Sequence, residues 1–91
     1  MTQYSGLRIK QICENKLGIE FRSGRGSHRN GWYVRNGRKL KRITVPCTRD
    51  EVPPKTFGSM ARQLGLNKRE FDELLRCILD EDEYFALIMH R

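Results

Sequence analysis

The stretch GWYVRNGRKLKRITV, residues 31–45, contains the most informative local pattern in the chain. It opens with aromatic and β-branched side chains, which favour strands, and it returns to β-branched side chains at its end. Between these parts, Asn36-Gly37 is the dipeptide preferred at the centre of a two-residue type I′ turn. The stretch therefore predicts a β-hairpin, and Pro46 is expected to close it.

A helix and a short strand are predicted ahead of the hairpin. Apolar side chains recur at helical spacing between Ser5, a suitable N-cap, and Gly18, a residue typical of helix ends. Directly afterwards, Ile19 and Phe21 alternate with charged residues, which is the period of a half-buried strand. This strand is expected to end in a flexible basic loop.

Further helices are predicted after Pro53 and Pro54, which bar a helix until about residue 55. From Phe57 onward, apolar residues at i, i+3, i+4 and i+7 predict a helix that ends near Gly65. Asn67, with a glutamate three residues later, makes a plausible capping box for a second helix. The apolar stripe expected on this helix consists of Phe71, Leu74, Leu75 and Ile78.

The apolar segment 84–89 is compatible with either a helix or a strand. Such a tail is expected to pack on its own domain or against a second copy of the chain, which makes a homodimer through residues 84–89 one possible assembly.

The order of these elements predicts an α+β fold of the form α-β-β-β-α, with one further segment at the end. A chain of 91 residues supports a single core, so residues 1–91 are expected to form one domain. The favoured arrangement is a three-stranded antiparallel sheet with helices on one face. The other face of the sheet is then free for a ligand.

Basic residues are concentrated in the first part of the chain. Lysine and arginine number 18 against 11 acidic residues, for a net charge of +7. Residues 1–55 hold 13 basic and 4 acidic residues, whereas residues 56–91 hold 5 and 7. We therefore expect a polyanion as partner, bound by the first half of the chain. Because no apolar run is long enough for a membrane span or a signal peptide, a cytoplasmic protein with no membrane partner is expected.

The three cysteines, Cys13, Cys47 and Cys77, are odd in number and widely spaced. They form no CxxC or Cys/His pattern, so reduced thiols are expected, with no disulfide framework, metal or other cofactor. Cys47 has no evident neighbour in the sequence that would stabilise its thiolate, and a structural role is therefore favoured over a nucleophilic one.

The segment RSGRGSHR, residues 22–29, combines glycines with arginines around a histidine. Glycine lets the backbone approach an anion closely, and arginine binds phosphate. Histidine can act as a general base toward a ribose 2′-hydroxyl, or as a general acid toward the leaving 5′-oxygen, without a metal. His28 is therefore the candidate catalytic residue, and the RNA-binding candidates beside it are Arg22, Arg25, Gly26, Ser27 and Arg29. The alternative is a solvated basic turn in which His28 only hydrogen-bonds phosphate or backbone.

Four residues of the hairpin, Tyr33, Arg35, Lys39 and Lys41, are further RNA-binding candidates. On a three-stranded sheet, one of the two adjacent aromatic residues must face the core. We assign Trp32 to the core and Tyr33 to the exposed face, where a tyrosine could stack on a base. The only other histidine, His90, lies at the C-terminal edge and is expected to be incidental.

The ordered set of these features resembles the HicA toxins of bacterial HicBA toxin–antitoxin modules, which are small mRNA interferases. The resemblance covers residues 5–78 and leaves residues 79–91 as an extension. The matching features are a helix and strand leading into Gly26-Ser27-His28, a hairpin, Thr44-Val45-Pro46, and the run from Thr56 to Leu66 followed by Glu70-Phe71.

This resemblance implies a fold like that of double-stranded-RNA-binding domains and the function of a type II toxin. The expected activity is metal-independent endoribonuclease cleavage of mRNA, with His28 as the catalytic general acid or base and Gly26 and Ser27 as its loop. The expected protein partner is a HicB-like antitoxin that covers the active site.

Two other classes of protein fit parts of the pattern. Residues 57–79 have the spacing of a helix-turn-helix DNA-binding module, with residues 68–79 as the recognition helix. Electrostatics disfavour this interpretation, because Glu70, Asp72 and Glu73 would lie where DNA phosphates repel them. A non-catalytic RNA-binding domain is the second alternative, and it differs from a nuclease in not needing His28.

Overall fold

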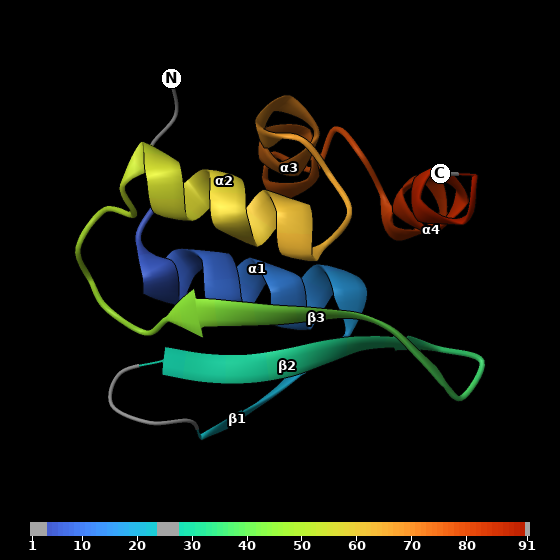
Figure 1. Cartoon of the computed structure of the whole chain (residues 1–91), viewed down its shortest axis with the longest axis horizontal. Helices are drawn as coiled ribbons and strands as arrows, with labels where there is room; N and C mark the ends of the chain where they lie inside the picture. Colours follow the sequence, from blue (N-terminus) through green and yellow to red (C-terminus); the bar gives the residue numbers. More distant parts are fainter. Residues whose placement is uncertain (1–3, 24–27, 91) are drawn as a thin grey trace.

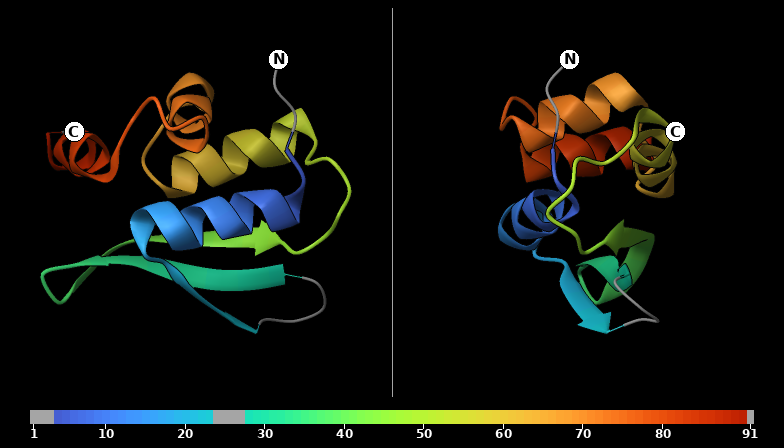
Figure 2. Two further views of the ribbon diagram at one scale, coloured as in Figure 1. Left: turned by 180° about the vertical axis from the view of Figure 1, so that it is seen from behind. Right: turned by 90° about the vertical axis from the view of Figure 1, so that its left-hand side faces the viewer.

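A computed structural model describes residues 4–23 and 28–90 of the chain. In this part of the chain, one antiparallel sheet has the strand order β1-β2-β3. The helices lie on one side of this sheet, and none of the described helices covers the opposite side (Figures 1 and 2). The predicted α+β class, with a three-stranded antiparallel sheet and helices on one face, is thus confirmed. The elements are α1 (Gly6–Leu17), β1 (Glu20–Ser23), β2 (His28–Arg35), β3 (Arg38–Pro46), α2 (Pro54–Gln63), α3 (Lys68–Leu75) and α4 (Glu81–Met89).

The predicted hairpin is formed by β2 and β3. Its turn residues Asn36 and Gly37 have φ values of 54° and 76°, and positive values at both central positions are what a type I′ turn requires. The ladder is interrupted once, because Tyr33 pairs with Lys41 whereas the next residue, Val34, pairs with Lys39. Leu40 is therefore the extra residue of a β-bulge.

The first helix has the predicted ends. The Ser5 side chain accepts a hydrogen bond of 3.1 Å from the backbone N–H of Arg8, and Gly18 ends the helix in the left-handed conformation with φ of 65°. Ile9, Cys13 and Leu17 are buried on one face of α1. The helix contacts β1 and β3 and covers one face of the sheet (Figure 1).

Helices α2 and α3 follow the predicted pattern except at their ends. Helix α2 begins at Pro54, slightly earlier than expected, because a proline is tolerated in the first turn, where its missing N–H has no intrahelical acceptor. The capping box of Asn67 and Glu70 at the start of α3 is confirmed. The prediction that Ile78 extends the apolar stripe of α3 is wrong. The helix ends at Leu75, Cys77 adopts a left-handed φ of 63°, and Ile78 is 60% exposed.

The segment that was compatible with helix or strand is helical. Asp80 and Glu83 form a capping box at the start of α4, in which each side chain accepts a hydrogen bond from the other residue's backbone N–H. Tyr84 and Ile88 of this helix belong to the same core as the sheet and the other helices. Residues 81–89 therefore pack on their own domain.

The core lies between the sheet and the helices. Its packing leaves no room for a side chain at Gly31 of β2. A Cβ atom on Gly31 would lie 2.4 Å from the Ile19 Cγ2 atom and 3.0 Å from the Phe21 Cδ1 atom. A side chain at position 31 would therefore displace the apolar contacts of the neighbouring strand. The fully or nearly fully buried residues of the core include Ile9, Cys13, Ile19, Tyr33, Ile43, Val45, Met60, Leu64, Phe71, Leu74 and Tyr84.

Candidate nucleic-acid interface

The uncovered face of the sheet carries alternate residues of β2. Gly31 and Tyr33 are buried beneath the helices, whereas His28, Trp32 and Val34 are exposed. Successive side chains of a strand point to opposite faces, so these three exposed residues lie on the side opposite to Gly31 and Tyr33. Figure 2 shows that the helices of the described chain leave this side of the sheet uncovered. We call this surface the open face.

Neighbouring strands add positive charge to the open face. Arg22 of β1 is paired with Asn30, Arg42 of β3 is paired with Trp32, and Lys39 is paired with Val34. Paired residues point to the same face, which brings these three cations to one surface. The strand register adds one carboxylate, that of Glu20, which is also paired with Trp32. The open face is thus predominantly basic, as the charge distribution of the chain predicts.

His28 is the first residue of β2 and is exposed. Its cross-strand partner is Pro46, and its carbonyl oxygen accepts a hydrogen bond of 3.2 Å from the Nη1 atom of Arg29. Two residues further along the open face, the Thr44 hydroxyl donates to the Asn30 side-chain oxygen at 2.7 Å. His28 therefore lies at one end of the open face, and the pairing of β2 with β3 fixes the position of its backbone.

The predicted RNA-binding residues fall into three groups. Arg22 and Lys39 lie on the open face with His28. Arg25, Gly26 and Ser27 lie outside the described residues. The others, Arg29, Tyr33, Arg35 and Lys41, occupy positions on the helix-covered side of the pleat or at its edge.

The assignment of the two adjacent aromatic residues is wrong in both positions. Tyr33 is fully buried and Trp32 is 41% exposed. The ring of Tyr33 makes an edge contact with Tyr84, with ring centroids 5.0 Å apart, and burial raises the pKa of its hydroxyl. Tyr33 is therefore a core residue, and Trp32 is the aromatic side chain available to a ligand.

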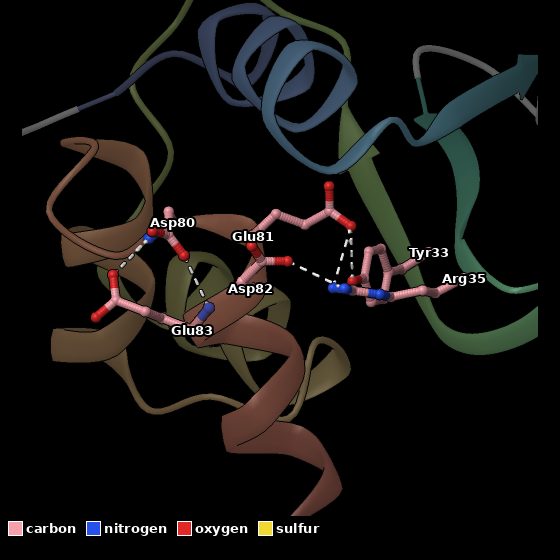
Figure 3. A network of polar contacts seen from close by, with 6 residues as sticks. All are labelled: Tyr33, Arg35, Asp80, Glu81, Asp82 and Glu83. Carbon is pink, nitrogen blue, oxygen red and sulfur yellow. Dashed lines mark hydrogen bonds and ion pairs between the residues drawn. The ribbon is translucent and has the colours of Figure 1, made fainter.

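Arg35 contacts α4 rather than the open face (Figure 3). Its Nη2 atom donates to the Asp82 Oδ1 atom at 3.0 Å, and its Nη1 atom lies 3.5 Å from the Glu81 Oε2 atom. The guanidinium group also stacks over the Phe85 ring at 4.1 Å, and the Tyr33 hydroxyl donates to Glu81 at 3.1 Å. Arg35, a predicted RNA contact, thus forms ion pairs with the acidic residues at the start of α4.

The β-bulge places Arg42, and not the predicted Lys41, on the open face. Without a bulge, Lys39 and Lys41 would share a face because they are two residues apart. The extra residue Leu40 reverses this alternation, so Lys41 is paired with buried Tyr33 and Arg42 with Trp32. Lys41 is half-buried and approaches Gly65, near the C-terminal end of α2. Arg42 was missed because nothing in the local sequence marks the bulge.

The segment that resembles a helix-turn-helix contains α2 and α3. The expected recognition helix over residues 68–79 ends at Leu75 and is therefore shorter than predicted. Two of its acidic side chains have local partners: Glu70 accepts from the Asn67 N–H at 3.0 Å, and Asp72 forms an ion pair with Arg76 at 3.6 Å. DNA binding through this segment stays a prediction that the structure does not test.

The described residues offer few features of other types of site. Across residues 4–23 and 28–90, no three histidine, cysteine, aspartate or glutamate side chains are grouped as metal ligands would be. All three cysteines are free. No described helix has both the length and the apolar character needed to cross a bilayer.

Comparisons of the chain with protein-family models, with curated proteins and with solved structures found no match.

Proposed function

We propose that this chain binds RNA on the open face of its sheet and cleaves it as a metal-independent endoribonuclease, in the manner of the toxin of a type II toxin–antitoxin module. The observation that carries the proposal is the position of His28. This exposed histidine begins β2 and shares a face with Arg22, Lys39 and Arg42. A general acid or base on the same surface as phosphate-binding cations suits RNA cleavage without a metal.

In the proposed reaction, the His28 imidazole accepts the proton of a ribose 2′-hydroxyl. The 2′-oxygen forms a bond to the adjacent phosphorus, and the bond between phosphorus and the 5′-oxygen breaks. The leaving 5′-oxygen takes a proton from the imidazolium or from water, which leaves a 2′,3′-cyclic phosphate and a 5′-hydroxyl end. The guanidinium groups of Arg22 and Arg42 counter the charge of the RNA backbone along the face.

The arrangement of elements supports a finer fold proposal. An α-β-β-β-α order with the helices on one face is compatible with a fold like that of double-stranded-RNA-binding domains. We propose a cytoplasmic location and a HicB-like antitoxin as protein partner, which would inhibit the toxin by covering the open face around His28. An acidic partner surface would suit the basic charge of this face.

The test compares purified wild-type protein with His28→Ala on single-stranded RNA in the presence of a chelator. Loss of a general acid or base typically lowers the rate by about 10²- to 10⁴-fold, so we expect His28→Ala to abolish detectable cleavage while changing affinity little. His90→Ala is the matched control, because His90 is exposed at the end of α4 and remote in sequence from the open face. Its cleavage rate is expected to equal that of the wild type.

Two outcomes would contradict the proposal. Cleavage by His28→Ala at the wild-type rate would refute the role of the histidine. RNA binding without cleavage by the wild type would favour the non-catalytic RNA-binding domain. Induced expression in bacteria, with growth and total mRNA integrity followed for both forms, tests the toxin function separately. Arrest and mRNA loss are expected with the wild type and not with His28→Ala.

A further inference from the structure

The single tryptophan of the chain is on the open face. Trp32 is 41% exposed, and Val34, two residues along the same strand, is 47% exposed. Full burial of an apolar side chain of this size stabilises a fold by about 1.5–3 kcal/mol, and these two partly exposed residues obtain only part of that stabilisation. Adjacent exposed apolar residues within a basic surface indicate a ligand-binding site more than a folding requirement.

A groove lies beside this tryptophan. Its volume is about 380 Å³, which is within the range of small-ligand sites. The residues lining the groove are Gly18, Glu20, Arg22, Trp32, Val34 and Lys39.

The charges of the groove limit what can occupy it. Lys39 places its Nζ atom 5.3 Å from the centroid of the Trp32 ring, and Arg22 also lines the groove. These two cations attract phosphate. The Glu20 carboxylate repels phosphate, but it can accept hydrogen bonds from the amino groups of a base. An occupant with an aromatic base, a negative backbone and hydrogen-bond donors on the base matches all four side chains.

We propose that Trp32 forms a base-stacking subsite for single-stranded RNA, with Arg22 and Lys39 contacting the phosphates on either side of the stacked base. This inference rests on the proposed RNA-binding function and specifies the form of RNA that is bound. In a duplex the faces of the bases are already stacked on their neighbours, whereas an unpaired base can stack on an aromatic side chain. Trp32 is four residues from His28 on the same face, or about 13 Å at 3.3 Å per residue. One single-stranded segment can therefore occupy both positions.

Tryptophan fluorescence gives a direct test, because Trp32 is the only tryptophan in the chain. The full-length His28→Ala protein, which is expected to bind without cleaving, is titrated with a short single-stranded oligocytidine. Stacking is expected to quench the fluorescence in parallel with binding followed by the anisotropy of labelled RNA. Heparin, a polyanion without bases, is expected to bind without comparable quenching.

Substitutions separate stacking from a simple apolar contact. Loss of one base–aromatic stack costs about 1–3 kcal/mol, so Trp32→Leu is expected to weaken oligocytidine binding by about 5- to 150-fold. Trp32→Phe keeps an aromatic ring and is expected to retain most of the affinity. Ile78→Ala, at an exposed apolar residue outside the open face, is the matched control and is expected to bind like the parent protein. Thermal unfolding of each variant verifies that it is folded.

The failure of this inference is distinguishable from that of the proposed function. RNA binding without quenching, and with equal affinities for Trp32→Leu and Trp32→Phe, would overturn the stacking subsite and leave RNA binding intact. Tighter binding and stronger quenching by a duplex than by the single strand would overturn it as well. Quenching and an aromatic requirement at position 32, in a protein whose wild type does not cleave RNA, would support the subsite and refute the nuclease.

Discussion

Substitution of Tyr84 tests whether α4 is an integral part of the domain. Tyr84 is fully buried, and its hydroxyl donates a hydrogen bond of 2.8 Å to the carbonyl oxygen of Leu64, at the end of α2. Its ring meets that of Tyr33 at an interplanar angle of 67°. Tyr84→Phe removes only the hydrogen bond, whereas Tyr84→Ala also removes the ring.

The expected destabilisation follows from these contacts. A buried hydrogen bond contributes about 0.5–1.5 kcal/mol net, and a carbonyl left unpaired in the core costs about 1–3 kcal/mol. We therefore expect Tyr84→Phe to lower the free energy of unfolding by about 1–2 kcal/mol. Tyr84→Ala leaves a cavity and should cost about 3–5 kcal/mol, a large share of the roughly 5–14 kcal/mol expected for a domain of this size.

Thermal and urea unfolding, followed by circular dichroism, measure both effects. For a domain of this size each kcal/mol lowers Tm by about 4–8 °C, so Tyr84→Phe should unfold roughly 4–16 °C below the wild type. Hydrogen exchange should show reduced protection of α4 in Tyr84→Ala before protection of α1 is lost. Met89→Leu is the control, because Met89 belongs to the same helix and is 55% exposed. If both Tyr84 variants matched Met89→Leu, α4 would not be packed on the core as described.

Two predictions concern titratable groups in the core. Burial raises the pKa of Tyr33 and of Tyr84, so the stability due to their neutral hydroxyls is complete below about pH 10, where unfolded tyrosine ionises, and is lost above it. Urea unfolding between about pH 10 and 11 should show a stability loss that is smaller by about 1 kcal/mol in Tyr84→Phe, because unfolded tyrosine is only partly ionised over this interval, and equal losses would contradict this. Burial also raises the pKa of the Cys13 thiol to about 12, whereas Cys77 is exposed. Alkylation near pH 8, mapped by peptide mass, should modify Cys77 well before Cys13, and equal rates in the native protein would show that Cys13 is accessible.

Much of the fold could be predicted because its signals are local. The Asn36-Gly37 turn, the Ser5 cap and the capping box at Asn67 each depend on residues within about four positions of one another, and each is present as expected. The end of α3 was predicted less well. The apolar spacing from Phe71 continues through Ile78, but the chain turns at Cys77 before that residue can join the stripe.

The part of the candidate site that could be predicted also depends on local signals. His28 and Arg22 could be found from the basic segment around them, and both lie on the open face. Trp32 was assigned to the wrong face, because the alternation of β2 leaves both parities open until one face is known to be covered by helices. The position of Arg42 on the open face could be predicted only by knowing, in addition, that Leu40 forms a bulge.

The sequence by itself determined the element order, the hairpin turn, the helix caps and the concentration of basic residues in the first half of the chain. Only the tertiary structure decided which side chains share the open face. Packing of α1 and α2 on one side of the sheet selects the parity of β2, and the extra residue in β3 reverses the parity of its last part. Side chains of a strand alternate between the two faces, so a change of parity or one extra residue moves every later side chain to the opposite face. For this reason Trp32 and Arg42 replace Tyr33 and Lys41 as the side chains that a ligand on the open face meets.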